Sequence, residues 1–278
     1  MERIKRNERM AALTKWLTDS PNQIFTLSQF CERFGSAKST MSEDIDILRQ
    51  VFETFELGRL ETVTGAAGGV RYRPYLSPKA SYDFVQELCG QLCVPSRVLP
   101  GGFLYLSDIL SLPEVVGKMG TIIAGEFYEA APDFVLTMET KGIPVALMAA
   151  QSLGVPLVIA RRSSKVYEGS AVNINYVSGS SGHIETMSLS RRAVKEGQRA
   201  LIVDDFMRAG GTARGMVDMM REFSVTVVGV CVLISTKEPV KKRLDGVKSL
   251  LVIDETDESA GSANIHPANW LIQAAGKA

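Results

Sequence analysis

Short apolar runs alternate with segments of helical periodicity from about residue 80 to about residue 255. The runs at 134–138, 155–159, 201–203, 225–234 and 250–253 are apolar and rich in β-branched residues, which is typical of buried strands. Between most of these runs, apolar residues recur every three or four positions, which predicts helices. Strands that alternate with helices predict an α/β fold with a mainly parallel sheet, flanking helices, and ligands at the carboxyl ends of the strands.

The first 75 residues follow a different pattern. Helical spacing of apolar residues predicts three helices, at 10–17, 27–34 and 36–52. Two runs at 60–63 and 70–72, joined by a glycine-rich turn, predict a β-hairpin. Two helices joined by a tight turn and followed by such a hairpin predict a winged helix, a DNA-binding domain that places the start of its last helix in the major groove.

The side chains expected at DNA are basic, or small and polar. They come from the N-terminal arm, the start of the third helix and the second strand of the hairpin: Arg3, Lys5, Arg6, Arg9, Ser36, Lys38, Ser39, Thr40, Ser42, Arg71 and Arg73. Ser36 is also expected to cap the third helix. The alternative is a protein-interaction module, because Glu43, Asp44 and Asp46 would have to face away from DNA.

Composition adds constraints to this picture. The formal net charge of the 278 residues is zero, so DNA binding must depend on a local basic surface. The prolines at 74–78 predict a linker, and we expect a DNA-binding domain at 1–75 and an effector-binding domain at 76–278. The four cysteines lack metal-ligand spacing, and no metal site is expected. Without a signal peptide or a membrane-length apolar run, we expect a cytoplasmic protein with reduced thiols.

The stretch Leu201–Thr212 carries the clearest candidate chemistry. A buried strand is followed by Asp204 and Asp205, a short loop, a glycine pair and Thr212, which we expect to cap the next helix. A glycine turn that opens a helix directs backbone N–H groups and positive dipole at one point, which suits a phosphate. The two carboxylates can accept hydrogen bonds from vicinal hydroxyls beside it. The pattern therefore predicts a ribose 5-phosphate ligand.

A second strand-to-helix turn repeats this arrangement. The loop from Thr137 to Gly142 combines a hydroxyl, an acid, a cation and a glycine. Lys141 and backbone amides could meet a pyrophosphate, and Glu139 could orient Lys141 or reach a Mg²⁺ ion. Between the two loops, the alternating runs at 172–177 and 183–187 predict a mobile hairpin that can cover the phosphate site.

Both loops resemble those of type I phosphoribosyltransferases, in which they bind phosphoribosyl pyrophosphate (PRPP). The resemblance, together with two aromatic residues of a preceding strand, implies the following effector-binding residues: Asp204, Asp205, Phe206, Met207, Arg208, Ala209, Gly210, Gly211, Thr212, Thr137, Glu139, Thr140, Lys141, Gly142, Phe103 and Tyr105.

The chain departs from the enzyme pattern just before the glycine pair. Catalytic relatives usually carry Thr or Asn where this chain has Ala209, and small residues where it has Met207 and Arg208. A lost hydroxyl-to-phosphate hydrogen bond costs about 1.5–3 kcal/mol, and Arg208 could compensate as a cation. No general base and no purine-base pocket are evident. We therefore expect ligand binding without transfer, and no catalytic residues.

A winged helix followed by a PRPP-binding domain resembles the purine operon repressors of Gram-positive-type bacteria. The most telling segments are Ser36–Asp44, Pro100–Phe103, Asn175–Ser181 and Val203–Thr212. The resemblance implies a homodimer that binds inverted-repeat operators of purine biosynthesis and transport genes and releases them when PRPP, with or without Mg²⁺, is abundant. The tail beyond residue 254 departs from the pattern.

Two alternatives remain open from the sequence. One is an active purine phosphoribosyltransferase with an autoregulatory DNA-binding domain. The other is the same repressor with a guanosine alarmone in the pocket, whose base could stack on Phe206 or Phe103.

Overall fold

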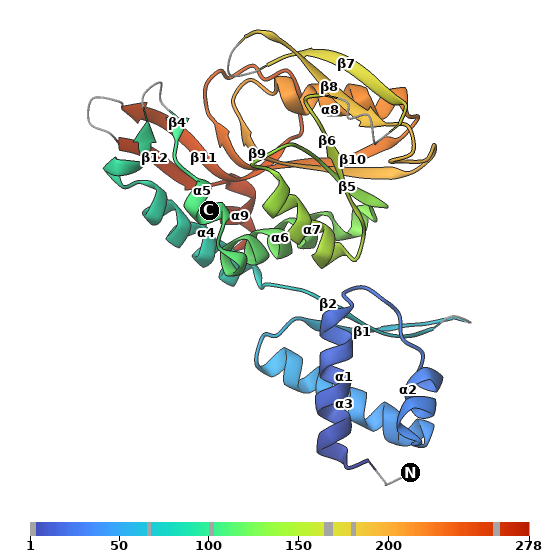
Figure 1. The fold of residues 1–278 in the computed structure, drawn as a ribbon. Helices are drawn as coiled ribbons and strands as arrows, with labels where there is room; N and C mark the ends of the chain where they lie inside the picture. The colour runs from blue at the N-terminus through green and yellow to red at the C-terminus, as the bar shows by residue number, and fades with distance from the viewer. Residues whose placement is uncertain are drawn as a thin grey trace. The chain divides into compact units, whose positions relative to one another are not determined.

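A computed structural model describes residues 4–65, 68–99, 103–163, 169–178, 182–257 and 262–277 (Figure 1). The chain forms two compact units, and the boundary along the chain lies between Ser77 and Pro78. Within the described ranges, no helix is both long enough and apolar enough to cross a lipid bilayer.

The smaller unit consists of three helices and a two-stranded ribbon, as the sequence predicts. The helices are α1 (Arg6–Asp19), α2 (Leu27–Phe34) and α3 (Lys38–Thr54). Strands β1 (Arg59–Val63) and β2 (Gly69–Arg73) pair antiparallel. Its core is a single apolar cluster drawn from all of these elements, with Leu13, Phe30, Met41 and Phe52 among the most buried side chains.

The helix ends of this unit show why the turn between α2 and α3 is tight. The Thr26 hydroxyl accepts a hydrogen bond from the Gln29 amide and caps α2, and Gly35 ends α2 in a left-handed conformation. Ser36 does not cap α3, contrary to expectation. The helix begins after Ala37, and the Ser36 hydroxyl instead donates to the Phe34 carbonyl.

The larger unit is built on a six-stranded sheet in the order β12-β11-β10-β9-β5-β6. Five of its strands are parallel: β5 (Phe134–Met138), β6 (Leu157–Ala160), β9 (Arg199–Met207), β10 (Thr226–Thr236) and β11 (Lys248–Asp257). Strand β12 (Ser262–Pro267) pairs antiparallel with β11 at the edge.

Helices cover both faces of this sheet. Helices α6 (Pro113–Phe127) and α7 (Ile143–Leu153) lie on one face, and α8 (Gly211–Glu222) lies on the other (Figure 1). The hairpin of β7 (Ala171–Val177) and β8 (Ile184–Ser190) packs against α8. Met187, Leu136 and Met216 are fully buried in the core between hairpin, sheet and α8. The predicted hairpin is therefore present, and it contributes apolar side chains to the core.

The remaining elements include α4 (Pro78–Leu92), which contacts β11 and β12, and several short segments. The short segments are the helices η1 (Pro95–Arg97), α5 (Ser107–Leu110), η2 (Tyr128–Ala130) and α9 (Asn269–Ala274), and the paired strands β3 (Val98–Leu99) and β4 (Phe103–Leu104). The tail after residue 254 extends the sheet through β12 and then packs α9 on α4. The Trp270 indole holds α9 by donating to the Ser249 carbonyl.

Candidate functional site

The stretch Leu201–Thr212, which we call the signature stretch, begins with a strand that is longer than its sequence predicts. Strand β9 continues to Met207, so Asp204 and Asp205 lie inside its carboxyl end. Gly210, in a left-handed conformation (φ 82°), is the residue before α8 and takes the N-cap position expected for Thr212. Thr212 is the second residue of α8. The first N–H groups of α8 have no partner within the helix, as the binding of a phosphate at a helix start requires.

The side chains of the loop divide between core and solvent. Met207 is buried in the core cluster between sheet and α8. Arg208 is exposed, while Phe206 and Ala209 are half-buried. The Met207 side chain is only 6% exposed, and its predicted contact with a ligand stays a prediction.

The two predicted loops meet at Gly142. A Cβ atom on Gly142 would lie 2.6 Å from both Asp204 Oδ1 and Thr137 Oγ1, closer than any carbon can approach. Only glycine therefore allows the turn after β5 to approach the acid at the end of β9. Thr137 is fully buried, and its hydroxyl has no hydrogen-bond partner among the described residues. An unpaired buried hydroxyl is costly, which marks this point as unusual.

The acidic pair is strongly perturbed by its surroundings. Burial first, and then the negative charge of Asp205, raise the pKa of Asp204 well above its ordinary value, and the positive charge of Arg162 opposes both effects. The Asp204 carboxylate accepts a hydrogen bond from the Asp205 amide at 3.0 Å. Perturbed carboxylates at the carboxyl end of a parallel strand are typical of ligand sites in α/β folds.

The rest of the second loop is arranged differently from the prediction. The Glu139 carboxylate accepts a hydrogen bond from the Arg162 amide at 2.7 Å and pairs with the Arg161 guanidinium at 3.6 Å. Glu139 therefore holds the loop after β6, and its predicted roles, orienting Lys141 or reaching Mg²⁺, stay predictions. Thr140 and Lys141 are exposed, and the peptide bond between Glu139 and Thr140 is cis.

A polar chain connects this loop to the hairpin. Arg162 pairs with Glu185 of β8 at 3.2 Å, and the Tyr176 hydroxyl of β7 donates to the same carboxylate at 2.8 Å. Burial first, and then the Glu185 carboxylate, raise the pKa of Tyr176 to about 12. The sequence did not predict that Arg162, Tyr176 and Glu185 contact one another, because no sequence pattern pairs residues across a hairpin with a distant loop.

Two further predicted effector-binding residues, Phe103 and Tyr105, come from the segment that precedes α5. Tyr105 is 44% exposed, and its backbone is held by Arg97: the amide donates to the Arg97 carbonyl and the carbonyl accepts from the guanidinium. The Phe103 side chain and residues 100–102 lie outside the described residues. No hydrogen bond or ion pair recorded for the described residues joins Tyr105 to the acidic pair.

Sequence reasoning also missed a loop that packs on the signature stretch. Residues 237–247, which follow β10, place the Lys242 ammonium against the Arg208 carbonyl and the Arg243 amide against the Ala209 carbonyl. The only signal in the sequence is the run of three cations at 241–243.

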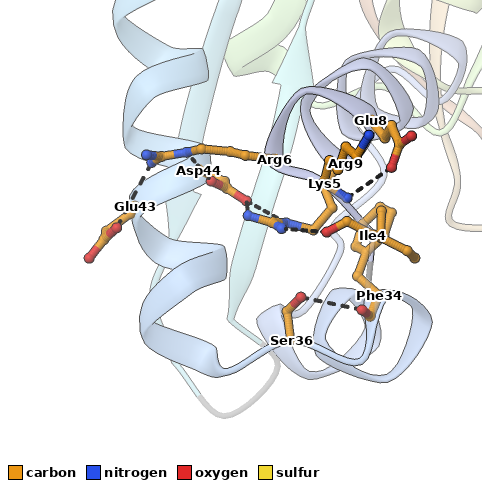
Figure 2. A network of polar contacts seen from close by, with 9 residues as sticks. All are labelled: Ile4, Lys5, Arg6, Glu8, Arg9, Phe34, Ser36, Glu43 and Asp44. Carbon is orange, nitrogen blue, oxygen red and sulfur yellow. Dashed lines mark hydrogen bonds and ion pairs between the residues drawn. The ribbon is translucent and has the colours of Figure 1, made fainter. Parts of the chain in front are cut away.

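The predicted DNA-binding arginines of α1 have a different environment from the one expected. Figure 2 shows Arg6 and Arg9 converging on Asp44 of α3. Arg9 is 7% exposed and its guanidinium pairs with the fully buried Asp44 at 2.7 Å. Arg9 therefore ties α1 to α3, which does not fit its predicted contact with DNA. Arg6 is half-exposed, pairs with Asp44 at 2.9 Å and lies 3.9 Å from Glu43.

The start of α3 offers an exposed polar surface. Lys38, Ser39 and Ser42 are exposed, and Thr40 is half-buried. Because Asp44 faces inward, it does not oppose DNA at this surface. Lys5 is also exposed, with its backbone amide bonded to Glu8 (Figure 2), and Arg3 lies outside the described residues.

The arginines of the wing are paired. Arg71 and Arg73 of β2 pair with Glu61 of β1 at 2.9 and 3.3 Å. Burial acts to raise the pKa of Glu61, but the hydrogen bonds and charges of the two arginines outweigh it, and the pKa lies below its ordinary value. The Arg73 side chain is only 12% exposed, so it is a poor candidate for a phosphate contact. Arg49, which sequence reasoning missed, joins α3 to β1 through the Leu60 carbonyl and the Thr62 hydroxyl.

Fold and site together define a class of protein: a regulator with a winged-helix DNA-binding unit and a phosphoribosyltransferase-fold unit. Comparisons with known proteins agree. The family "Bacterial purine repressor, N-terminal" matches residues 5–74, and the family "Phosphoribosyl transferase domain" matches residues 106–264. The crystal structure of adenine phosphoribosyltransferase from Thermoanaerobacter pseudethanolicus superposes with a TM-score of 0.52 at 21% identity, covering 59% of this chain and 96% of that one, which establishes the fold.

Two full-length relatives specify the family. The chain is 45% identical over 269 residues to the purine biosynthesis transcriptional repressor PurR of Bacillus subtilis, covering 97% of this chain and 94% of that one. It is 42% identical over 266 residues to the purine biosynthesis transcriptional activator PurR of Lactococcus lactis, covering 96% and 98%. The chain belongs to the PurR family of purine biosynthesis transcriptional regulators.

Proposed function

We propose that this protein represses purine biosynthesis and transport genes by binding operator DNA through residues 4–77, and that PRPP in the larger unit relieves the binding. The two relatives are named for opposite regulatory outcomes, so the sign of regulation belongs to the proposal. The observation that carries the effector assignment is the meeting of both phosphate loops at Gly142, beside the buried Asp204.

PRPP fits the chemistry of this point. The ribose hydroxyls can donate to Asp204 and Asp205, and the start of α8 can receive the 5-phosphate. The pyrophosphate can meet the exposed Lys141 and the backbone of its loop. A ligand hydroxyl or phosphate oxygen near Thr137 would give its unpaired hydroxyl a partner.

Mg²⁺ enters this proposal only through the ligand. No group of three His, Cys, Asp or Glu side chains that could hold a metal ion occurs in the part of the chain that the structure describes. Glu139, the predicted Mg²⁺ contact, is already paired with Arg161 and Arg162.

We propose further that the site binds PRPP without transferring its ribosyl group. Ala209 lacks the hydroxyl that the enzyme pattern places before the glycines, and the full-length relatives are named as regulators. Steady release of pyrophosphate from PRPP with adenine, guanine, hypoxanthine or xanthine would contradict this part of the proposal.

The effector must act by binding two states of the protein with different affinity, of which one binds DNA better. We propose that two copies of the chain act together on an inverted-repeat operator, as the resemblance to purine operon repressors implies. Sedimentation of the protein with and without operator measures the number of copies.

The experiment that tests the function is operator binding at fixed salt with PRPP from zero to millimolar concentration, because phosphate contacts make affinity steeply salt-dependent. We expect PRPP to weaken operator binding by the native chain. The double variant Asp204→Ala/Asp205→Ala should bind operator normally and lose the response, whereas Asp218→Ala, an exposed acid on α8, should behave as native. An operator affinity of the native chain that PRPP leaves unchanged would overturn the proposal.

A further inference from the structure

The loop after β10 lies beside the signature loop (residues 208–210), because these two loops follow β10 and β9, which are neighbours in the sheet. Strands β9 and β10 pair in parallel, with Phe206 beside Ile234 and Met207 beside Ser235. The chain leaves both strands at the same edge of the sheet, so residues 237–247 run alongside residues 208–210. We call residues 237–247 the cationic loop, because it carries Lys237, Lys241, Lys242 and Arg243.

Two donors of the cationic loop hold two consecutive carbonyl groups of the signature loop. The Lys242 ammonium donates to the Arg208 carbonyl at 2.6 Å, and the Arg243 amide donates to the Ala209 carbonyl at 2.9 Å. A second hydrogen bond holds Lys242 in place, because its ammonium also donates to the Thr236 carbonyl at 2.7 Å. Thr236 is the last residue of β10, so the ammonium is anchored to the rigid sheet.

The orientation of these carbonyls also fixes the direction of the N–H groups on the opposite side of the signature loop. A trans peptide is planar, and its C=O and N–H groups point in opposite directions. The Arg208 carbonyl shares its peptide with the Ala209 N–H, and the Ala209 carbonyl shares its peptide with the Gly210 N–H. Holding the two carbonyls therefore presents the N–H groups of Ala209 and Gly210 on the side away from the cationic loop, at the start of α8.

Charge supports the same arrangement. Burial lowers the pKa of the Lys242 ammonium, the carboxylate of Glu238 opposes this, and the positive charge of Arg208 lowers it further. Two cations thus lie close together beside the phosphate cradle. An anion bound in the cradle would reduce their repulsion.

We propose that Lys242 is a positioning residue for the phosphate cradle: by holding the Arg208 carbonyl against the end of β10, it aims the backbone N–H groups of the signature loop at the 5-phosphate of the ligand. This inference rests on the proposed function. The inference gives the two loops separate roles, because the pyrophosphate group is assigned to the loop at 137–142. No hydrogen bond or ion pair recorded for the described residues joins Lys242 to that loop.

The test compares ligands that do and do not carry the 5-phosphate. Lys242→Met keeps the length of the side chain and removes its donors, and Lys241→Met is the matched control, an exposed cation next to it in the chain. Calorimetry with PRPP, ribose 5-phosphate and inorganic pyrophosphate gives three affinities for each protein. We expect Lys242→Met to bind PRPP and ribose 5-phosphate roughly 10- to 100-fold more weakly, the effect of one lost hydrogen bond to a charged group. Pyrophosphate and operator affinities should match the native chain.

Other outcomes overturn the inference. If Lys242→Met binds ribose 5-phosphate as the native chain does, or loses pyrophosphate affinity equally, Lys242 does not position the 5-phosphate cradle. If Lys242→Met does not fold, Lys242→Arg is the deciding variant, because it keeps a donor for the Arg208 carbonyl. A PRPP affinity of Lys242→Arg within a few-fold of native supports the role of Lys242. A loss of affinity as large as that predicted for Lys242→Met contradicts it. A native chain that binds no PRPP refutes the proposed function itself, whereas native binding with an unaffected Lys242→Met refutes only this inference.

Discussion

The Asp44 carboxylate of α3 and the Arg9 guanidinium of α1 form an ion pair at 2.7 Å in the interior of the DNA-binding unit. Arg6 joins the same carboxylate from the half-exposed side, and the Arg9 guanidinium also donates to the Ile4 carbonyl (Figure 2). One buried acid therefore holds the start of α1, and the arm that leads into it, against the last helix of the winged helix.

Removal of the Asp44 charge should destabilise this unit strongly. Asp44→Asn leaves Arg9 buried without its counter-charge, and breaking a buried pair in this way costs about 3–5 kcal/mol. Urea unfolding followed by Trp16 fluorescence in a Trp270→Phe background reports on this unit alone. Asp46→Asn, which removes an exposed acid paired with Arg49, should change the free energy of unfolding by less than about 1 kcal/mol. Equal stabilities of the two variants would contradict the role given to Asp44.

Lys38, exposed in the first turn of α3, should act as a phosphate contact. Lys38→Gln should weaken operator binding and reduce the slope of log affinity against log salt by about one unit. Titrations at several salt concentrations measure the slope. Lys15→Gln, an exposed cation of α1 paired with Asp19, is the control and should leave the slope unchanged. An unchanged slope for Lys38→Gln would show that Lys38 does not contact a DNA phosphate.

The contact at Gly142 predicts an effect on both stability and ligand binding. In Gly142→Ala the new methyl group meets Asp204 and Thr137, so the loop must move, at a cost of about 1–3 kcal/mol. PRPP affinity should fall by roughly tenfold or more as the two loops separate. Gly125→Ala in α6 adds a methyl group into open space and should be neutral or stabilising by up to about 1 kcal/mol. Thermal unfolding and calorimetry check both variants, and native PRPP affinity in Gly142→Ala would show that the loops do not need this approach.

The ion pairs of Glu61 predict a pH-dependent contribution to stability. Because the pKa of Glu61 is lowered in the folded protein, its ionised form contributes stability above its ordinary pKa of 4.5, and this is lost as the pH falls through the lower folded value. Glu61→Gln should therefore lower the melting temperature near neutral pH. The difference from the native chain should narrow below about pH 4.5. Melting curves across this range test the prediction, and a difference that does not depend on pH would contradict it.

The sequence predicted most of the fold, because local patterns decide local structure. The apolar runs of β5, β9 and β10 and the helical spacing of α2 and α3 all correspond to elements of the structure. The acidic pair of the signature stretch stands out in the sequence because its chemistry is contiguous. Errors of detail came at element ends: β9 includes Asp204 and Asp205, and the caps of α3 and α8 are Ala37 and Gly210.

The environment of each charge was decided only by the tertiary structure. Arg9 and Lys38 are both cations that the sequence predicts to contact DNA. Arg9, however, is buried against an acid 35 residues away along the chain, whereas Lys38 is exposed. Likewise, Glu139 meets the amide of Arg162, and Lys242 meets the carbonyl of Arg208, 34 residues away. Hydrophobic periodicity is a property of neighbouring residues, so the sequence by itself determined the elements and the signature stretch. The partner of a charge depends on how the elements pack, and that information exists only once the chain has folded.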